Sequence, residues 1–359
     1  MGRAAGVLGR GDSRPSPQAP PLRPSAGRTL PEPRPAPEAV VAGRTLPEPR
    51  WSTSRRALNP LRIASRHEPS PPPSLRPPGA RAYSLRTSRG EFAVVDAPVA
   101  DGVTPRGTAL LLPGFTGSKE DFNPLHEPLA ARGYRTVAVD GRGQYQSGGP
   151  DTDESAYAQD ELAKDVLAQA AAVGAPVHLV GHSLGGQIAR AAVLLDPTPF
   201  RSLTLMSSGP AQISGSQQQR VKLLRDALAV MSMAKVWDAI QAMEPPEETD
   251  TGELDEGLDD RDDLRRRWLG NKPAQLIATG RQLCTEPDRV GELAAVALPF
   301  HVLSGAHDDT WPVPLLDDMA VRLHAHRTVI AGAEHSPNTD RPLETARAFA
   351  DFWDTVPGD

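Results

Sequence analysis

Short runs rich in apolar and β-favouring residues alternate with stretches of helical periodicity from about residue 82 onward. The apolar runs span residues 108–112, 135–139, 177–180, 202–206, 300–303 and 328–330. Continuous runs of this length are typical of strands that are covered on both faces. Amphipathic helical patterns follow at about 119–132, 154–173, 187–195, 313–323 and 341–353. This alternation predicts parallel strands joined by right-handed crossovers, and therefore an α/β fold with a mostly parallel sheet and helices on both faces.

Two stretches depart from the alternation. Residues 83–88 and 91–95 predict a leading hairpin that turns at Arg89 and Gly90. Between 212 and about 289 only helical runs are found, around a very acidic stretch at 244–263. We interpret residues 210–290 as a lid inserted between the sixth and seventh strands. Its apolar stripe (Met231, Met233, Trp237, Ile240 and Met243) fits either internal lid packing or an apolar wall above a binding site.

The N-terminal region has a different composition from the rest of the chain. Eighteen of the 38 prolines lie in residues 1–80, and the first 90 residues hold 16 Arg and no Lys. Such a chain buries too little apolar surface to offset its ordering entropy, so we expect residues 1–81 to be disordered. A nucleic-acid contact, a transit segment and a twin-arginine signal are alternative interpretations. The net charge of −6 for the whole chain implies an acidic body, which argues against a nucleic-acid partner.

The remaining composition narrows the class of protein. Cys284 is the single cysteine, so an intramolecular disulfide is excluded. No apolar run reaches the roughly 18 residues that a membrane span requires, and the first 30 residues lack the apolar core of a signal peptide. We therefore expect a cytoplasmic protein without a membrane span. No His, Asp or Glu set has the spacing of a metal site, and no phosphate-binding loop motif is found, so no metal and no cofactor are expected.

The segment most informative about chemistry is Gly181-His182-Ser183-Leu184-Gly185. An apolar strand precedes it and a helical run follows it. Gly-x-Ser-x-Gly in that setting is typical of a nucleophile elbow, a sharp turn that exposes the serine hydroxyl. A side chain at Gly181 or Gly185 would press on the neighbouring strand or helix.

Several motifs in a fixed order resemble the α/β-hydrolase superfamily over about residues 82–356. They are Leu112-Pro113-Gly114-Phe115, Asp140-Gly141-Arg142-Gly143, the Ser183 elbow, Gly305-Ala306-His307-Asp308 with Pro312, and Gly332-Ala333-Glu334-His335-Ser336. One position departs, because Pro113 stands where many members have His. The resemblance implies the α/β-hydrolase fold with a helical lid.

The resemblance also implies a role for each candidate residue. Ser183 would be the nucleophile and His335 its general base, with Asp308 orienting the imidazole. Asp309 is the adjacent rival for the acid, but the Gly305–Asp308–Pro312 spacing favours Asp308. The backbone N–H groups of Phe115 and Leu184 would stabilise the oxyanion. His182 is expected either to pack in the core or to support the residues of the site from behind.

These residues predict a serine hydrolase that cleaves a small carboxylic ester or thioester through an acyl-enzyme on Ser183. A carbon–carbon bond hydrolase or lyase of the same fold, similar to one in menaquinone biosynthesis, would use the same triad, and so would a cofactor-free perhydrolase. Epoxide hydrolases and dehalogenases of this fold use Asp where this chain has Ser183. The sequence gives no indication of the oligomeric state.

Overall fold

A computed structural model describes residues 77, 79–243 and 256–357, which belong to one compact unit. The N-terminal extension expected at 1–81 lies almost wholly outside the described residues, and so do residues 244–255 of the acidic stretch. In this part of the chain eight strands form one sheet. They are β1 (Arg81–Thr87), β2 (Gly90–Ala97), β3 (Gly107–Leu112), β4 (Tyr134–Val139), β5 (Val177–His182), β6 (Phe200–Met206), β7 (Phe300–Gly305) and β8 (His326–Ile330).

The order of the strands is β1-β2-β4-β3-β5-β6-β7-β8. From β4 to β8 every neighbouring pair is parallel, whereas β2 runs antiparallel to both β1 and β4. The parallel arrangement brings the carboxyl ends of β3, β5, β7 and β8 to one edge of the sheet. The predicted fold class, a mostly parallel sheet within an α/β fold, is therefore confirmed.

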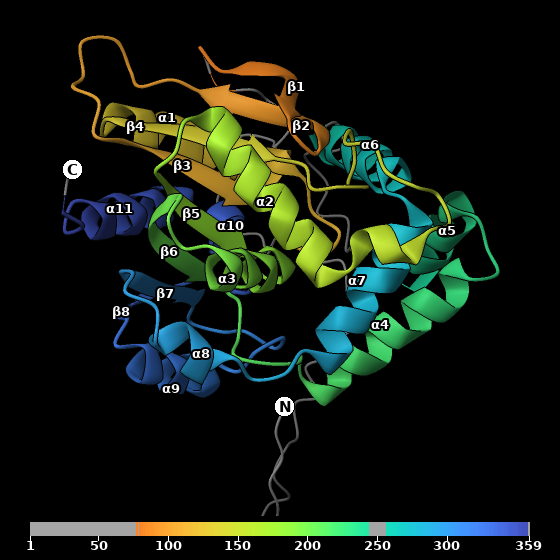
Figure 1. Cartoon of the computed structure of the whole chain (residues 1–359). Helices are drawn as coiled ribbons and strands as arrows, with labels where there is room; N and C mark the ends of the chain where they lie inside the picture. Colours follow the sequence, from red (N-terminus) through yellow and green to blue (C-terminus); the bar gives the residue numbers. More distant parts are fainter. Residues whose placement is uncertain (1–76, 78, 244–255, 358–359) are drawn as a thin grey trace, which may run out of the picture. The chain divides into compact units, whose positions relative to one another are not determined.

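Helices cover both faces of the sheet (Figure 1). One face carries α2 (Gln159–Val173), α3 (Leu184–Leu195) and α9 (Val313–Leu323), and the other carries α1 (Asn123–Ala131) and α11 (Pro342–Trp353). Along β3, Leu110 and Leu112 pack into the first layer, while Ala109 and Leu111 pack into the second. This alternation explains the continuous apolar runs, because both faces of each central strand are buried.

Between β6 and β7 the described residues form five helices: α4 (Gly215–Leu228), α5 (Met233–Met243), α6 (Glu256–Gly270), α7 (Pro273–Thr285) and α8 (Val290–Ala294). We call α4–α7 the roof. The roof helices form an apolar cluster of their own, separate from the two sheet layers, with Leu224, Leu228, Val236, Trp237, Trp268 and Leu276 buried in it. Met231, Met233 and Ile240 pack against this cluster. Of the two interpretations of the apolar stripe, these contacts favour packing within the roof.

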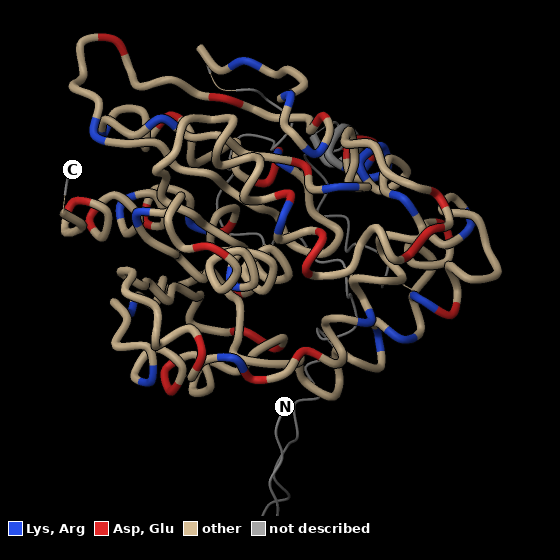
Figure 2. Tube along the Cα trace, viewed as in Figure 1, with Lys and Arg blue, Asp and Glu red and all other residues tan. Residues whose placement is uncertain are grey.

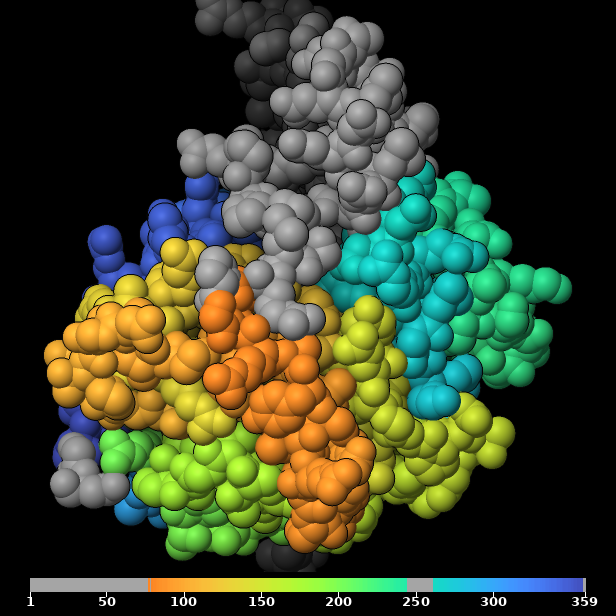
Figure 3. Space-filling view, turned by 90° about the horizontal axis from the view of Figure 1, so that it is seen from above, coloured from red at the N-terminus to blue at the C-terminus, as the bar shows by residue number. Residues whose placement is uncertain are grey.

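The chain enters and leaves the roof at one place, which we call the neck. There the Gln212 N–H donates to the Glu286 carbonyl (2.9 Å) and the Ile213 N–H donates to the Leu283 carbonyl (3.0 Å). In the space-filling view of Figure 3 the roof helices, coloured green to cyan, gather to one side of the orange β1–β2 hairpin. Figure 2 shows that acidic and basic residues are intermixed along these helices, so their described parts are not uniformly acidic.

Several predicted elements differ in detail. The helix expected at 119–132 begins as a 3₁₀ turn, η1 (Lys119–Phe122), and the α-helix starts only around Pro124, whose fixed φ suits a first helical turn. The helix expected at 154–173 is likewise split into η2 (Glu154–Tyr157) and α2. The hairpin turns at Ser88 and Arg89, because Thr87 pairs with Gly90. A last short helix, α10 (Pro337–Asp340), precedes α11.

Candidate active site

Ser183 occupies a strained turn between β5 and α3. Its φ of 53° and ψ of −118° lie in a region that residues with a side chain rarely adopt. The two flanking glycines make the turn possible. A Cβ at Gly181 would lie 2.4 Å from the Gly185 carbonyl oxygen, and one at Gly185 would lie 2.5 Å from the Pro113 carbonyl oxygen. The helix α3 starts immediately after the serine, at Leu184.

Ser183, His335 and Asp308 form a continuous hydrogen-bonded chain. The His335 Nε2 atom lies 3.0 Å from the Ser183 Oγ atom, and the His335 Nδ1 atom lies 3.0 Å from each Asp308 carboxylate oxygen. The three residues come from the ends of β5, β7 and β8, which the parallel topology gathers at one edge of the sheet. In this geometry Nε2 is placed to accept the hydroxyl proton while Nδ1–H donates to the carboxylate.

The two adjacent carboxylates have different surroundings. The Asp308 side chain is fully buried, and its Oδ1 atom accepts the backbone N–H groups of Thr310 (2.8 Å) and Trp311 (3.1 Å). The Asp309 side chain is 63% exposed and accepts a hydrogen bond from Gln217 on α4 (2.7 Å). The structure thus brings Asp308, and not Asp309, into contact with the imidazole.

The electrostatic setting of His335 favours a protonated intermediate. Burial alone would lower the pKa of the imidazole, but the contacting Asp308 carboxylate outweighs burial and raises that pKa above the ordinary value of 6.5. A higher pKa makes His335 a stronger proton acceptor and stabilises the imidazolium that would form during attack.

The proposed oxyanion donors lie on either side of the nucleophile. Leu184 begins α3, and Phe115 follows β3 in a loop that approaches the elbow. Among the described residues, neither backbone N–H donates any of the loop, turn or side-chain hydrogen bonds.

A cavity of about 110 Å³ opens above these groups. Its floor includes Ser183, His335 and the loop after β3, and its roof is formed by Gln217 and Val221 of α4 with Leu283 of α7. The remaining lining residues are Gly114, Phe115, Thr116, Gly117, Asp121, His182, Ile213, Thr310, Ser336 and Asn338. The apolar stripe of α5 contributes nothing to this lining. The cavity is smaller than the roughly 150 Å³ pocket that holds a benzene ring, so it suits a short acyl group.

Three supporting residues had no assigned role in the sequence. The buried Ser208 hydroxyl donates to the Ser183 carbonyl (2.7 Å), which helps hold the strained turn. The Trp311 ring stacks 6.2 Å from the His335 ring, and the Gln144 amide donates to the Gly114 carbonyl (2.8 Å). No local pattern marks them, because each acts across a long sequence separation.

His182 is buried, as a packing residue would be, but it also contacts the catalytic loop. Burial lowers the pKa of its imidazole to about 3, so the ring is neutral near pH 7. Its Nε2 atom lies 2.9 Å from the His335 carbonyl oxygen and must donate the proton there. His182 thereby fixes the backbone of the candidate base.

The described residues show neither a metal-ligand cluster nor a membrane-spanning helix. They hold no group of three or more His, Cys, Asp or Glu side chains arranged for a metal ion. None of the helices in the described ranges is both long enough and apolar enough to cross a bilayer.

Comparison with known proteins defines the family. The model of the Alpha/beta hydrolase family matches residues 109–348, a range that holds all five motifs. The chain belongs to the alpha/beta hydrolase family, and the predicted membership is confirmed. It is therefore a hydrolase of this fold.

Individual relatives represent two kinds of hydrolase. The chain is 30% identical over 261 residues to a pimeloyl-(acyl-carrier protein) methyl ester esterase of Aeromonas hydrophila, covering 68% of this chain and 94% of the relative. It is also 30% identical over 224 residues to a 2-hydroxy-6-oxononadienedioate/2-hydroxy-6-oxononatrienedioate hydrolase of Paraburkholderia xenovorans, covering 59% of this chain and 72% of that relative. Among solved structures, an esterase of Thermogutta terrifontis aligns with a TM-score of 0.60 at 20% identity, over 77% of this chain and 99% of the esterase, which supports the fold.

Proposed function

We propose that this protein is a serine hydrolase that cleaves small carboxylic esters, or thioesters, through an acyl-enzyme on Ser183. The observation that carries the proposal is the unbroken Ser183–His335–Asp308 hydrogen-bonded chain, with 3.0 Å at each link, beneath a cavity. A serine hydroxyl is a weak nucleophile at neutral pH and needs an adjacent base, which His335 supplies.

The reaction would proceed in two halves. The Ser183 oxygen attacks the carbonyl carbon while His335 Nε2 takes the hydroxyl proton, and Asp308 stabilises the imidazolium. The N–H groups of Phe115 and Leu184 bind the oxyanion, and His335 returns the proton to the departing alcohol or thiol. Water, deprotonated by the same imidazole, then attacks the acyl-enzyme and releases the acid and free Ser183.

The size of the cavity adds a substrate preference to the proposal. A cavity of about 110 Å³ with an apolar side of Ile213, Val221 and Leu283 suits a short acyl chain. We therefore expect acetyl to hexanoyl esters to be better substrates than decanoyl esters.

A second candidate is carbon–carbon bond hydrolysis, favoured by the similarity to the dienedioate hydrolase of Paraburkholderia. That reaction would use the same triad, and a perhydrolase would differ only in the nucleophile that releases the acyl group.

One experiment separates these possibilities. A panel of p-nitrophenyl esters, acyl thioesters and vinylogous 1,5-diketones is tested beside fluorophosphonate labelling, with the labelled residue located by peptide mass spectrometry. Ester turnover with a single label on Ser183 supports the proposal. Turnover of diketones alone would favour the second candidate. Absence of both turnover and label from the folded protein would refute the serine mechanism.

A further inference from the structure

Residues 114–121 form the loop that would present the Phe115 N–H to an oxyanion. Five of these residues line the cavity, among them Phe115 and Asp121. Contacts at both ends fix the shape of the loop. At one end Gln144 donates to the Gly114 carbonyl (2.8 Å), and at the other end the Ser118 N–H donates to the Asp121 Oδ2 atom (3.1 Å).

The Asp121 carboxylate lies directly against the loop that it stabilises. A Cβ at Gly117 would lie 2.4 Å from its Oδ2 atom, and only 6% of the Asp121 side chain is exposed. Burial raises the pKa of Asp121 above its ordinary value of 3.8, and the charge of Arg267 opposes that rise. A buried negative charge at the cavity wall would oppose the negative charge that develops on an oxyanion, unless a cation compensates it.

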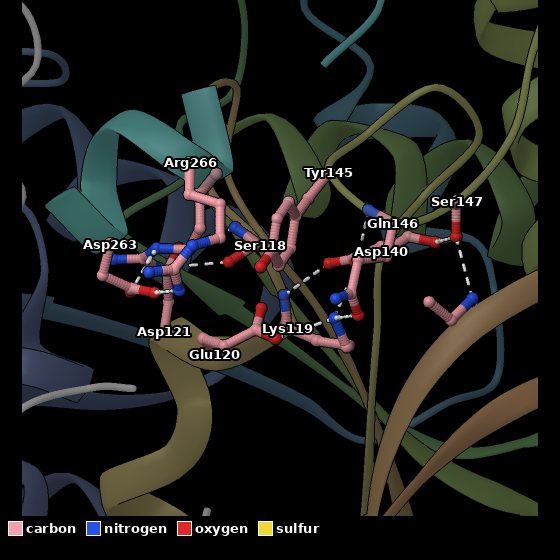
Figure 4. Close-up of polar contacts among 12 residues, drawn as sticks. Ser118, Lys119, Glu120, Asp121, Asp140, Tyr145, Gln146, Ser147, Asp263 and Arg266 are labelled. Atoms are coloured by element: carbon pink, nitrogen blue, oxygen red, sulfur yellow. Dashed lines mark hydrogen bonds and ion pairs between the residues drawn. The ribbon is translucent and has the colours of Figure 1, made fainter. Parts of the chain in front are cut away.

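The compensating cation comes from the roof. Arg267 on α6 donates from Nη1 to the Asp121 Oδ1 atom (2.6 Å) and to the Ser118 hydroxyl (3.1 Å). Its Nε atom lies 3.2 Å from the Asp263 carboxylate, and its side chain is 5% exposed. Figure 4 shows Asp263 on the α6 ribbon facing Ser118 and Asp121 of the loop. A single guanidinium therefore joins the roof to the residues that shape the loop.

A second buried cation in the same cluster serves only the body. The Lys119 Nζ atom contacts Asp140 (2.8 Å), Gln146 (2.8 Å) and Glu120 (2.7 Å), and it lies 4.7 Å from the Tyr145 ring centre (Figure 4). These contacts anchor the far end of the loop to β4. They involve no roof residue, whereas Arg267 links the Asp263 carboxylate of the roof to the Asp121 carboxylate of the loop.

We propose that Arg267 is a positioning residue for the proposed reaction: it neutralises and orients Asp121, and thereby holds the 114–121 loop with the Phe115 N–H directed at the oxyanion. The inference rests on the proposed function of Ser183. It makes the roof part of the catalytic geometry, in addition to covering the substrate. Arg267 itself touches no substrate.

The test compares Arg267→Gln with the wild type, using p-nitrophenyl butyrate turnover and inhibition by a trifluoromethyl ketone, which forms an oxyanion on the serine. Removing one oxyanion donor typically costs about 10²–10³ in kcat, so a displaced donor should cost about 10- to 100-fold. We expect kcat to fall by that factor, KM to change less than about threefold, and ketone affinity to fall in parallel with kcat. Arg267→Lys keeps the positive charge but loses the planar set of N–H donors, so it should recover part of the kcat lost in Arg267→Gln.

The double variant Asp121→Asn/Arg267→Gln addresses the charge argument and guards against misfolding. Replacing both partners avoids an unpaired buried charge, so this variant should fold and should regain at least about threefold in kcat over Arg267→Gln. Arg281→Gln is the control for an exposed roof–body ion pair, because the Arg281 side chain is 54% exposed and pairs with Glu154 (3.0 Å) away from the loop. It should leave kcat unchanged.

The outcomes are distinct. An unchanged kcat in folded Arg267→Gln overturns the inference, and so does a double variant that folds but recovers nothing, since the loss would then be structural. A loss in Arg281→Gln equal to that in Arg267→Gln would also overturn it. If the wild type neither turns over esters nor labels at Ser183, the proposed function fails instead, which the wild-type arm reveals by itself.

Discussion

The floor and the roof of the candidate site are held in place by different kinds of contact. The floor is part of the sheet, where Ser183 and Asp308 follow β5 and β7, which are buried along their whole length, and His335 follows the edge strand β8. The roof has only a small apolar cluster of its own. It is joined to the body by apolar contacts of Val221 and Leu283 and by the buried ion pair of Arg267 with Asp121 (2.6 Å). The comparison teaches that the packed sheet holds the proposed triad, whereas the roof contributes one wall of the cavity and, through Arg267, a directional contact to the 114–121 loop.

The largest expected effect removes the nucleophile from the floor. Ser183→Ala should reduce the turnover of p-nitrophenyl butyrate by about 10⁴-fold or more, because the attacking oxygen is lost. The melting temperature should stay within a few degrees, since the strained turn remains. Initial rates and thermal melts measure both. Residual turnover above about 1% of wild type would contradict the proposed mechanism.

Asp308 and Asp309 are adjacent in sequence, but the Asp308 carboxylate contacts His335 of the floor and the Asp309 carboxylate contacts Gln217 of the roof. Substituting each in turn therefore compares the two regions. Asp308→Asn should lower kcat by about 10³- to 10⁴-fold, because the imidazole loses its orienting carboxylate. Asp309→Asn, which affects a contact to Gln217 of α4, should change kcat by less than about threefold. Steady-state kinetics of the two variants decide the assignment. A larger loss in Asp309→Asn would assign the acid to Asp309.

The third expected effect is a pH dependence of kcat/KM, set by His335 in the floor of the site. The base must be neutral to accept a proton, and Asp308 raises the pKa of His335 above 6.5. Therefore kcat/KM should rise with pH, reach half its maximum above pH 6.5, and fall about tenfold per pH unit well below that point. In Asp308→Asn, burial is left as the main influence and should move the midpoint to lower pH. A wild-type midpoint below pH 6 would refute this assignment.

A smaller effect is expected from the roof. Val221 of α4 lines the cavity, and Val221→Ala should enlarge it by about two methyl groups. The ratio of kcat/KM for octanoyl over butyryl p-nitrophenyl esters should rise by about tenfold, in line with the free energy of burying one or two methylene groups. Leu223→Ala on the same helix is the control, because Leu223 is 59% exposed. An equal change in both variants would exclude the cavity as the cause.

The smallest effect is expected from the N-terminal extension. Deleting residues 1–80 removes none of the described strands, because β1 begins at Arg81. The melting temperature and kcat should therefore stay within error of the full chain. A loss of more than about fivefold in kcat would show that the extension contributes to the site.

The sequence predicted the floor much better than the roof, for a physical reason. Strands buried on both faces leave continuous apolar runs, and a strained turn at Ser183 requires glycines at fixed spacing, so both are visible locally. Family membership and the mostly parallel sheet are confirmed. The roles of Ser183, His335, Asp308 and the two N–H donors stay predictions, which the geometry supports.

The contacts that join the layers could not be predicted in the same way. Arg267 and Asp121 lie 146 residues apart, and nothing in either local pattern distinguishes them from the many surface charges nearby. The same holds for Ser208, whose hydroxyl reaches the Ser183 carbonyl only because β5 and β6 are neighbours in the sheet. The division of the 119–132 helix into a 3₁₀ turn and α1 was missed for a different reason, because helical periodicity does not report the position of Pro124 in the first α-helical turn.

The neck at Gln212–Ile213 and Leu283–Glu286 has a consequence for how such proteins diversify. Because the two ends of the insertion are hydrogen-bonded to each other, about seventy residues form an insertion whose start and end lie side by side at the sheet. A cassette of another length and shape can be exchanged at these four positions while the strands beneath keep their spacing. We therefore expect substrate selectivity to change independently of the triad, provided that each replacement insertion supplies a cation to the Asp121 carboxylate.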